Sequence, residues 1–377
     1  MIPYGKQNIS QKDIDEVIDV LKSDYLTQGP KVPEFEDKIS KFVDSKFCVA
    51  VNSATSALHI ACLAIGVKPK DIVWTVPNTF VASSNAALYC GAKVDFVDID
   101  LKTNNICIVE LTKKLKKAKE NNCLPKAIIP VHLAGLSCNM REIAMLSKEF
   151  GFKVIEDASH CIGGAYKGKK IGSCEYSDLC VFSFHPVKII TTGEGGAITT
   201  NSSALYSSMK KLRTHGITKD PKKFKKCAVP SWYYQQTLLG FNYRMTDIQA
   251  SLGISQLDRL ENFIEQRKKI ANLYIENLSS HFNIIDKSLN QGSSNHLFIL
   301  KTPKRDSLRE SLLKNNIFCT LHYFPIHLQP YYMSLGFKKG DFPKSEEYGA
   351  TALSIPIYPG LTEFEINKII KHLKDFN

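Results

Sequence analysis

Short apolar runs alternate with helix-like segments through the first two-thirds of the chain. Seven apolar runs have the length and composition of strands, at 47–52, 72–77, 93–99, 127–135, 153–158, 179–185 and 196–201. Helical periodicity fills several intervals, at 54–66, 79–91 and 140–151. The strand runs are continuously apolar, which is typical of a sheet covered by helices on both faces. The pattern therefore predicts an α/β fold built on a mostly parallel, doubly wound, seven-stranded sheet.

The pattern changes near residue 246, where the sequence predicts one long charged helix over 246–278. Two further strands and two further helices follow, at 295–301, 317–324, 305–315 and 362–374. These elements predict a smaller α+β domain over 246–377, after a large domain over 1–245. The segment 217–237 is polar and aromatic without periodicity, which predicts a loop.

Composition narrows the class of protein. Of the 377 residues, 44% are hydrophobic and 23% charged, which is typical of a globular protein. No apolar run approaches the ~20 residues that a membrane span needs, and the first ten residues lack a signal-peptide layout. The 11 cysteines include no C-x-x-C pair. We therefore expect a cytoplasmic protein with free thiols, no metal site and no membrane partner.

The formal net charge of +12 is carried mostly by lysine, with basic runs at 113–119 and 222–226. Such runs raise the possibility of nucleic-acid binding. The first run, however, falls on a helix pattern whose apolar positions are Leu111, Leu115 and Ala118, so most of its lysines face water. We favour a solvated lysine-rich surface and expect no nucleic-acid partner. A positive field would still attract anionic small molecules.

Candidate chemistry follows the predicted strand ends, where open α/β sheets bind their ligands. The run 52–58, NSATSAL, opens a helix, so it forms either a phosphate site or an ordinary serine-capped start. Asp157 ends an apolar strand and needs a partner. The pyridinium nitrogen of pyridoxal phosphate (PLP) is one such partner, and a structural or capping role is the alternative. His160 either contacts the cofactor's ring hydroxyl or is a satisfied core histidine.

The strongest local signal is the segment 182–197, FSFHPVKIITTGEGGA. Lys188 stands among apolar residues, before Gly193, Gly195 and Gly196, which allow a sharp backbone reversal. Desolvation lowers the pKa of a lysine and raises the neutral, nucleophilic fraction that Schiff-base chemistry requires. The phosphate-loop pattern G-x-x-x-x-G-K-[ST] is absent. Lys188 is therefore the predicted Schiff-base lysine.

A series of motifs, in this order, resembles the DegT-type sugar aminotransferases of PLP-dependent fold type I. They are NSATSAL, VPNTFVAS, EDASH, SFHPVK, GEGGA, GFNYRMTDIQA and HYFPIHLQPYY. The resemblance runs from Tyr4 to the final helix. Within that family, the stretch 159–196 looks most like the UDP-4-amino-4,6-dideoxy-N-acetyl-β-L-altrosamine transaminases of pseudaminic acid biosynthesis. The resemblance implies PLP as cofactor, L-glutamate as amino donor and a UDP-linked 4-keto-6-deoxy sugar as acceptor.

The resemblance also implies residue roles. Lys188 would hold PLP and move the proton between cofactor and sugar, Asp157 would pair with the pyridine nitrogen, and His160 would lie near the phenolic oxygen. The remaining cofactor contacts would be Phe80 on the ring face, Ser53, Ala54, Thr55 and Ser183 at the phosphate, and Asn242 from the neighbouring subunit of a homodimer with shared active sites. The substrate pocket would be lined by Tyr4, Asp24, Tyr25, Leu26, Thr27, Ala54, Ser183, His185, Asn242, His322, Tyr323, Phe324 and Pro325.

Several alternatives remain beside this assignment. Asn78 and Cys161 depart from related sequences and bear on substrate fit. Other nucleotide keto-sugars, of perosamine, bacillosamine or 3-amino type, are rival acceptors, and only the long match over 159–196 argues against them. A PLP-dependent sugar dehydratase would carry histidine in place of Lys188, and His185 does not substitute for it. A PLP-binding regulator would need a DNA-binding module, for which no segment remains.

Overall fold

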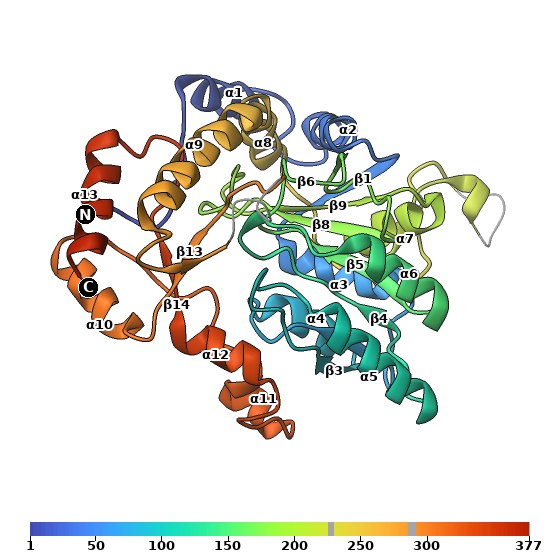
Figure 1. Ribbon diagram of the computed structural model, residues 1–377. Helices are drawn as coiled ribbons and strands as arrows, with labels where there is room; N and C mark the ends of the chain where they lie inside the picture. Colours follow the sequence, from blue (N-terminus) through green and yellow to red (C-terminus); the bar gives the residue numbers. More distant parts are fainter. Residues whose placement is uncertain (225–229, 286–291, 377) are drawn as a thin grey trace.

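A computed structural model describes residues 1–224, 230–285 and 292–376, and a seven-stranded sheet forms its centre (Figure 1). The strands lie in the order β1-β9-β8-β5-β4-β2-β3. Their bounds are β1 Phe47–Val51, β2 Ile72–Thr75, β3 Lys93–Phe96, β4 Ala127–Ile128, β5 Lys153–Asp157, β8 Leu179–Ser183 and β9 Gly196–Thr200. Strand β9 runs in the opposite direction to the other six strands of this sheet. The predicted α/β fold with a mostly parallel seven-stranded sheet is confirmed.

Helices cover both faces of the sheet, because successive side chains of a strand point to opposite faces. Ile129 and Ile155 belong to a buried cluster with α3 (Ala54–Ala64), α4 (Ala82–Tyr89) and α7 (Ser203–Arg213). Their neighbours Ile128 and Val154 belong to another cluster with α5 (Ile108–Glu120) and α6 (Met140–Phe150). The continuous apolar strand runs are therefore buried on both sides.

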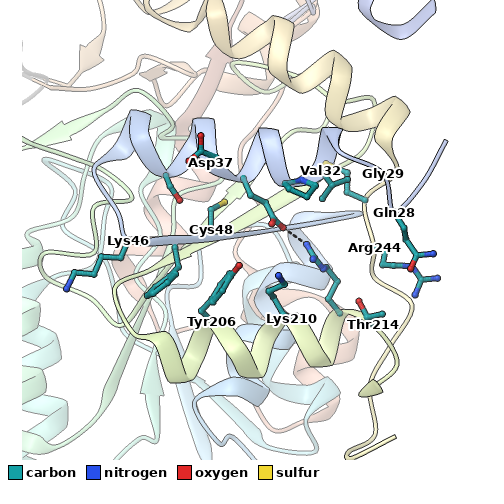
Figure 2. A pocket seen from close by; sticks show the side chains of 16 residues that line it. Gln28, Gly29, Val32, Asp37, Lys46, Cys48, Tyr206, Lys210, Thr214 and Arg244 are labelled. Carbon is teal, nitrogen blue, oxygen red and sulfur yellow. Dashed lines mark hydrogen bonds and ion pairs between the residues drawn. The ribbon is translucent and has the colours of Figure 1, made fainter. Parts of the chain in front are cut away.

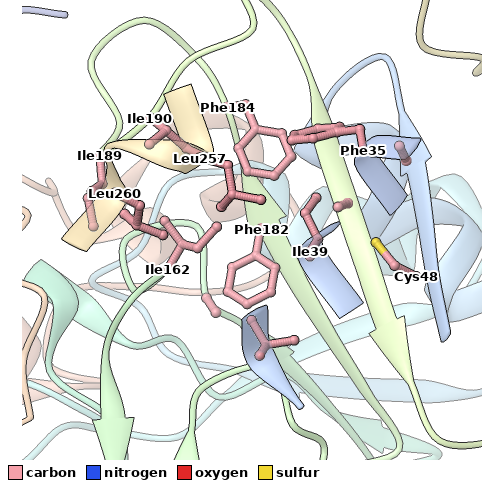
Figure 3. Close-up of a cluster of buried hydrophobic side chains, with 14 of the residues drawn as sticks. Phe35, Ile39, Cys48, Ile162, Phe182, Phe184, Ile189, Ile190, Leu257 and Leu260 are labelled. Carbon is pink, nitrogen blue, oxygen red and sulfur yellow. The ribbon is translucent and has the colours of Figure 1, made fainter. Parts of the chain in front are cut away.

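A third cluster lies where β8 meets α2 (Lys31–Val43) and α8 (Asp247–Asp258) (Figure 3). Phe182 of β8 and Phe35 of α2 are fully buried there. Ile189 and Ile190 pack into the same cluster. The chain that follows β8 is therefore anchored to the core immediately after Lys188.

The lysine-rich helix α5 behaves as its pattern predicts. It buries Leu111, Leu115 and Ala118. Of its lysines, all but Lys114 are exposed, and Lys114 pairs with Asp95. The second basic run lies partly outside the described residues.

The prediction of one helix over 246–278 is wrong, because the chain breaks at Arg259 into α8 and α9 (Leu260–Leu278). The guanidinium of Arg259 donates to the backbone and side-chain oxygens of Asn8, both at 2.8 Å, and pairs with the buried Asp13. The two helices pack on different neighbours. α8 lies against α1 (Gln11–Leu21) and α2, and α9 lies against α13 (Glu363–Asp375).

The C-terminal part contains a three-stranded antiparallel sheet of β12 (Asn283–Ile284), β13 (Phe298–Lys301) and β14 (Ala352–Ile355). Its other helices are α10 Arg305–Lys314, α11 Pro330–Ser334 and α12 Pro343–Thr351. The predicted strand over 317–324 is wrong, since the segment makes only isolated bridges at Ile317 and Thr320. The side chains of His322 and Tyr323 bond instead to Ser354 and His160. The domain boundary at 245/246 stays a prediction.

Short elements complete the description. They are β6 Ala165–Tyr166, β7 Lys169–Lys170, β10 Ile217–Thr218, β11 Gln235–Gln236 and the 3₁₀ turns Leu133–Gly135, Pro221–Lys223 and Ile326–Leu328. The predicted loop 217–237 thus carries the short β10–β11 pair and one 3₁₀ turn, and residues 225–229 lie outside the described chain. The ten described cysteines are free thiols, while Cys227 lies outside this description. Within the described ranges, no helix is long and apolar enough to cross a membrane.

Candidate active site

A cavity of about 460 Å³ lies at the carboxyl ends of β5 and β8, beside the start of α3. Many of the predicted site residues line it, namely Tyr4, Ser53, Ala54, Thr55, Phe80, Asp157, His160, Ser183, His185, Lys188, His322 and Tyr323. They come from the N-terminus, from the ends of the four strands β1, β2, β5 and β8, and from the segment after α10. The fold therefore gathers side chains that are up to about 320 residues apart in the sequence into one site.

Lys188 lies in the turn between β8 and β9. Its backbone amide donates to the carbonyl of His185 at 2.8 Å. Loss of water around the ammonium lowers the pKa of Lys188 to about 8, although the nearby Asp157 carboxylate opposes this shift. The Lys188 ammonium can therefore lose its proton near neutral pH and give the neutral amine that a nucleophilic lysine requires.

Asp157 ends β5 and is buried. Its Oδ2 accepts a hydrogen bond of 2.6 Å from the hydroxyl of Ser83, and its Oδ1 accepts one of 3.1 Å from the amide of Ser159. The Asp157 carboxylate also interacts electrostatically with Lys188. Because a buried carboxylate is costly without a cationic partner, Asp157 can pair with a cationic group of a ligand in the cavity.

The first turn of α3 also lines the cavity. The Oγ of Ser53 accepts from the amide of Ser56 at 3.1 Å, so Ser53 caps the helix. The amides of Ala54 and Thr55 have no acceptor within the helix, as in any first helical turn. At Gly196 a Cβ atom would lie 2.7 Å from the amide nitrogen of Ala54, so only glycine lets β9 approach here. Free amides at a helix start suit a phosphate group.

Neutral histidines form another wall. Burial, reinforced by the charge of Lys188, lowers the pKa of His160 far below its usual value and lowers that of His322 to about 3. The Nδ1 atom of His160 accepts from the amide of Ala134 at 3.3 Å, so Nε2 carries the hydrogen and donates to the Tyr323 hydroxyl at 3.0 Å. Neutral imidazoles can offer a ligand hydrogen bonds but no positive charge.

Some predicted residues do not line this cavity in a single chain. In the turn 24–27, Tyr25 and Leu26 are exposed, and Thr27 forms a bridge with Thr246. Asn242 forms a bridge with Thr214, and Phe324 is exposed beside Pro325. The roles of these residues stay predictions, and for Asn242 the predicted place is the cavity of a partner subunit.

The structure adds site residues that the sequence did not reveal. Thr79, Ser159, Glu194 and His296 also line the cavity, and Ser83 bonds to Asp157 from behind. The rings of His296 and His160 lie 4.5 Å apart between centroids. Thr79, Ser83, Ser159 and Glu194 stand inside the motifs VPNTFVAS, EDASH and GEGGA, but a motif does not show which of its side chains face a cavity. His296 lies outside these motifs, and only long-range packing brings it to the site.

A second cavity, of about 420 Å³, lies between α2, β1 and α7 (Figure 2). Among its lining residues Glu36 pairs with Arg213, and both bond to the backbone of Ala50. Burial raises the pKa of the Cys48 thiol at its edge well above the usual value, so this cysteine is unreactive. None of the predicted site residues lines this cavity, and the catalytic assignment stays with the Lys188 cavity.

Comparison with protein families and with curated sequences places the chain among sugar aminotransferases. The profile of the DegT/DnrJ/EryC1/StrS aminotransferase family matches residues 7–374. A UDP-4-amino-4,6-dideoxy-N-acetyl-β-L-altrosamine transaminase from Campylobacter jejuni is 42% identical over 89% of this chain and 87% of the relative. A GDP-perosamine synthase from Caulobacter vibrioides is 34% identical over 99% of this chain and 97% of the relative.

Solved structures of aminotransferases also resemble this chain. PseC of Helicobacter pylori, an aminotransferase involved in the biosynthesis of pseudaminic acid, superposes with a TM-score of 0.90 at 29% identity, covering 99% of this chain and 98% of the other. A putative sugar aminotransferase of Streptococcus pneumoniae in its PLP form has a TM-score of 0.88 at 29% identity, covering 99% and 98%. The predicted enzyme class, fold type I and PLP dependence are confirmed.

Proposed function

Because this chain belongs to the DegT/DnrJ/EryC1/StrS family and is a PLP-dependent sugar aminotransferase, we propose that it aminates C4 of a UDP-linked 4-keto-6-deoxy sugar with L-glutamate as donor. The product would be UDP-4-amino-4,6-dideoxy-N-acetyl-β-L-altrosamine, for pseudaminic acid biosynthesis. One observation carries the chemistry, namely that a lysine with its pKa lowered to about 8 shares a cavity with the buried Asp157. The altrosamine transaminase relative supports the choice of sugar.

The donor set of the cavity fits PLP. When bound, PLP supplies an aldehyde that bonds to primary amines and an electron-withdrawing ring. The Lys188 amine would be the nucleophile for that aldehyde and the base that moves a proton at the reacting carbon of the substrate. Asp157 would keep a proton on the ring nitrogen. The Ser53 and Ser183 hydroxyls and the amides of Ala54 and Thr55 would bind the phosphate.

The other assigned side chains orient the cofactor and the sugar nucleotide. The Phe80 ring would stack on one cofactor face, and His160 would lie near its phenolic oxygen. Tyr4, His185, His322 and Tyr323 line the part of the cavity left for the sugar nucleotide. Since His322 is neutral, it would recognise hydroxyl or amide groups of the substrate by hydrogen bonding.

A homodimer with shared active sites is part of the proposal. The turn 24–27, Asn242, Phe324 and Pro325 lie outside the chain's own cavity and would complete the partner's. Large apolar side chains are exposed in or near these segments, with Tyr25 56%, Leu239 79% and Phe324 47% accessible. Exposed apolar surface of this kind favours association with another copy. We further propose a cytoplasmic location, since free thiols are typical of a reducing compartment.

Amination of a GDP-linked 4-keto sugar is the second candidate, since the GDP-perosamine synthase relative matches nearly the whole chain. Both reactions use the same lysine chemistry, so only the nucleotide and sugar pocket separate them. The test is to incubate the PLP-loaded enzyme with glutamate and either UDP- or GDP-linked 4-keto-6-deoxy sugars, with products identified by mass and NMR. We expect the UDP-linked altrosamine precursor to be aminated. Amination of the GDP-linked sugar alone would overturn the substrate and leave the enzyme class intact.

A further inference from the structure

A row of buried hydroxyl groups ends at the Asp157 carboxylate. The Oγ of Ser83 lies 2.6 Å from Asp157 Oδ2, and the Oγ1 of Thr79 lies 2.9 Å from the Oγ of Ser83. Ser83 is 1% exposed and Thr79 2% exposed. Ser83 does not line the cavity, so it can reach a ligand there only through Asp157.

The chemistry of the groups sets the direction of these hydrogen bonds. An ionised carboxylate only accepts hydrogen bonds, so the Ser83 hydroxyl donates to Asp157. The oxygen of Ser83 is then free to accept from the hydroxyl of Thr79. The amide of Ser159 donates to the other carboxylate oxygen at 3.1 Å. Each oxygen of Asp157 is thus held by one donor, which fixes the carboxylate plane and still leaves lone pairs for a ligand.

We propose that Ser83, supported by Thr79, positions the Asp157 carboxylate against the ring nitrogen of PLP and thereby sets the affinity of the enzyme for its cofactor. This inference rests on the proposed function, in which Asp157 pairs with that nitrogen. Ser83 is a positioning residue, because it touches neither cofactor nor substrate. Without its hydroxyl, Asp157 Oδ2 loses a charge-assisted hydrogen bond, and the carboxylate is free to rotate away from the ring nitrogen.

The neighbouring Ser84 provides a matched control. It is also fully buried on α4, but its hydroxyl bonds to Tyr332 and to the carbonyl of Val81, away from Asp157. Ser83→Ala and Ser84→Ala remove the same atoms from adjacent positions of one helix. Both variants lose a buried hydrogen bond, and only Ser83→Ala loses the bond to Asp157.

The experiment measures the dissociation constant of PLP from the apoenzyme by absorbance titration, together with the pH dependence of the bound cofactor's spectrum. We expect Ser83→Ala to weaken PLP binding by roughly tenfold or more, the range of a hydrogen bond to a charged group, and to shift the spectral titration. Ser83→Thr keeps the hydroxyl, so its PLP affinity and spectral titration should match those of the wild type. Ser83→Cys, whose thiol donates weakly, should show a smaller loss and gives the answer if Ser83→Ala does not fold. Ser84→Ala should leave PLP affinity and spectrum unchanged.

Asp157→Asn separates this inference from the proposed function. Should Asp157→Asn retain wild-type PLP affinity and turnover, the pairing of Asp157 with the ring nitrogen would be wrong, and the role of Ser83 with it. If Asp157→Asn weakens PLP binding while Ser83→Ala binds PLP as tightly as Ser84→Ala does, only the role of Ser83 is overturned. A Ser83→Ala defect that persists undiminished in the Asp157→Asn background would also overturn it, because the effect would not pass through Asp157.

Discussion

The lowered pKa of Lys188 leads to a quantitative prediction about how the apoenzyme captures PLP. Only the neutral amine attacks the aldehyde. With a pKa of about 8 in place of 10.5, the neutral fraction at pH 7 is roughly 10% instead of roughly 0.03%, a gain of about 300-fold. The second-order rate of PLP capture should therefore rise about tenfold per pH unit below pH 8 and level off above it.

Stopped-flow absorbance with apoenzyme and PLP, from pH 6 to pH 10, measures this profile. Asp157 raises the pKa of Lys188, so Asp157→Asn should move the inflection to lower pH. Removal of an exposed lysine in Lys116→Ala should leave it in place. A wild-type rate that still rises about tenfold per pH unit up to pH 10 would refute the argument, because it would mean that the Lys188 amine stays hydrated in the folded protein and keeps its ordinary pKa.

Three further outcomes are expected. Lys188→Ala should abolish turnover and the borohydride-stable labelling of peptide 182–197 by PLP, whereas Lys116→Ala should keep both; label on another lysine in the wild-type enzyme would contradict the assignment. Gly196→Ala should weaken PLP binding and cost about 1–3 kcal/mol of stability, because its Cβ would lie 2.7 Å from the amide nitrogen of Ala54; unchanged cofactor affinity in a titration would argue against a phosphate site at α3. Phe182→Ala should lower the free energy of unfolding by about 3–5 kcal/mol in urea, since the ring is fully buried. The same substitution at Phe364, which is 79% exposed, should cost below about 0.5 kcal/mol, and equal losses would show that burial does not set the cost.

The sequence alone determined the mostly parallel central sheet, and it pointed to Lys188 as the Schiff-base lysine, whose role stays a prediction. Continuous apolar runs predict strands buried on both faces, because a strand exposed on one side would alternate. Lys188 was predicted because its neighbours are apolar and glycine follows, features that lie within one segment of 16 residues, 182–197. Local sequence is sufficient to predict a feature when residues close together in the chain determine it.

Only the tertiary structure decided what depends on residues far apart in the chain. The helix pattern over 246–278 continues through Arg259, whereas in the structure the helix breaks at Arg259, whose side chain bonds to Asn8 and Asp13 near the N-terminus. The apolar run 317–324 leaves the sheet because its side chains bond to distant partners. Likewise Ser83 ends the motif VPNTFVAS, but its proposed role depends on a hydrogen bond to a residue 74 positions away. Packing between distant segments is set by the whole chain, so no local pattern encodes it.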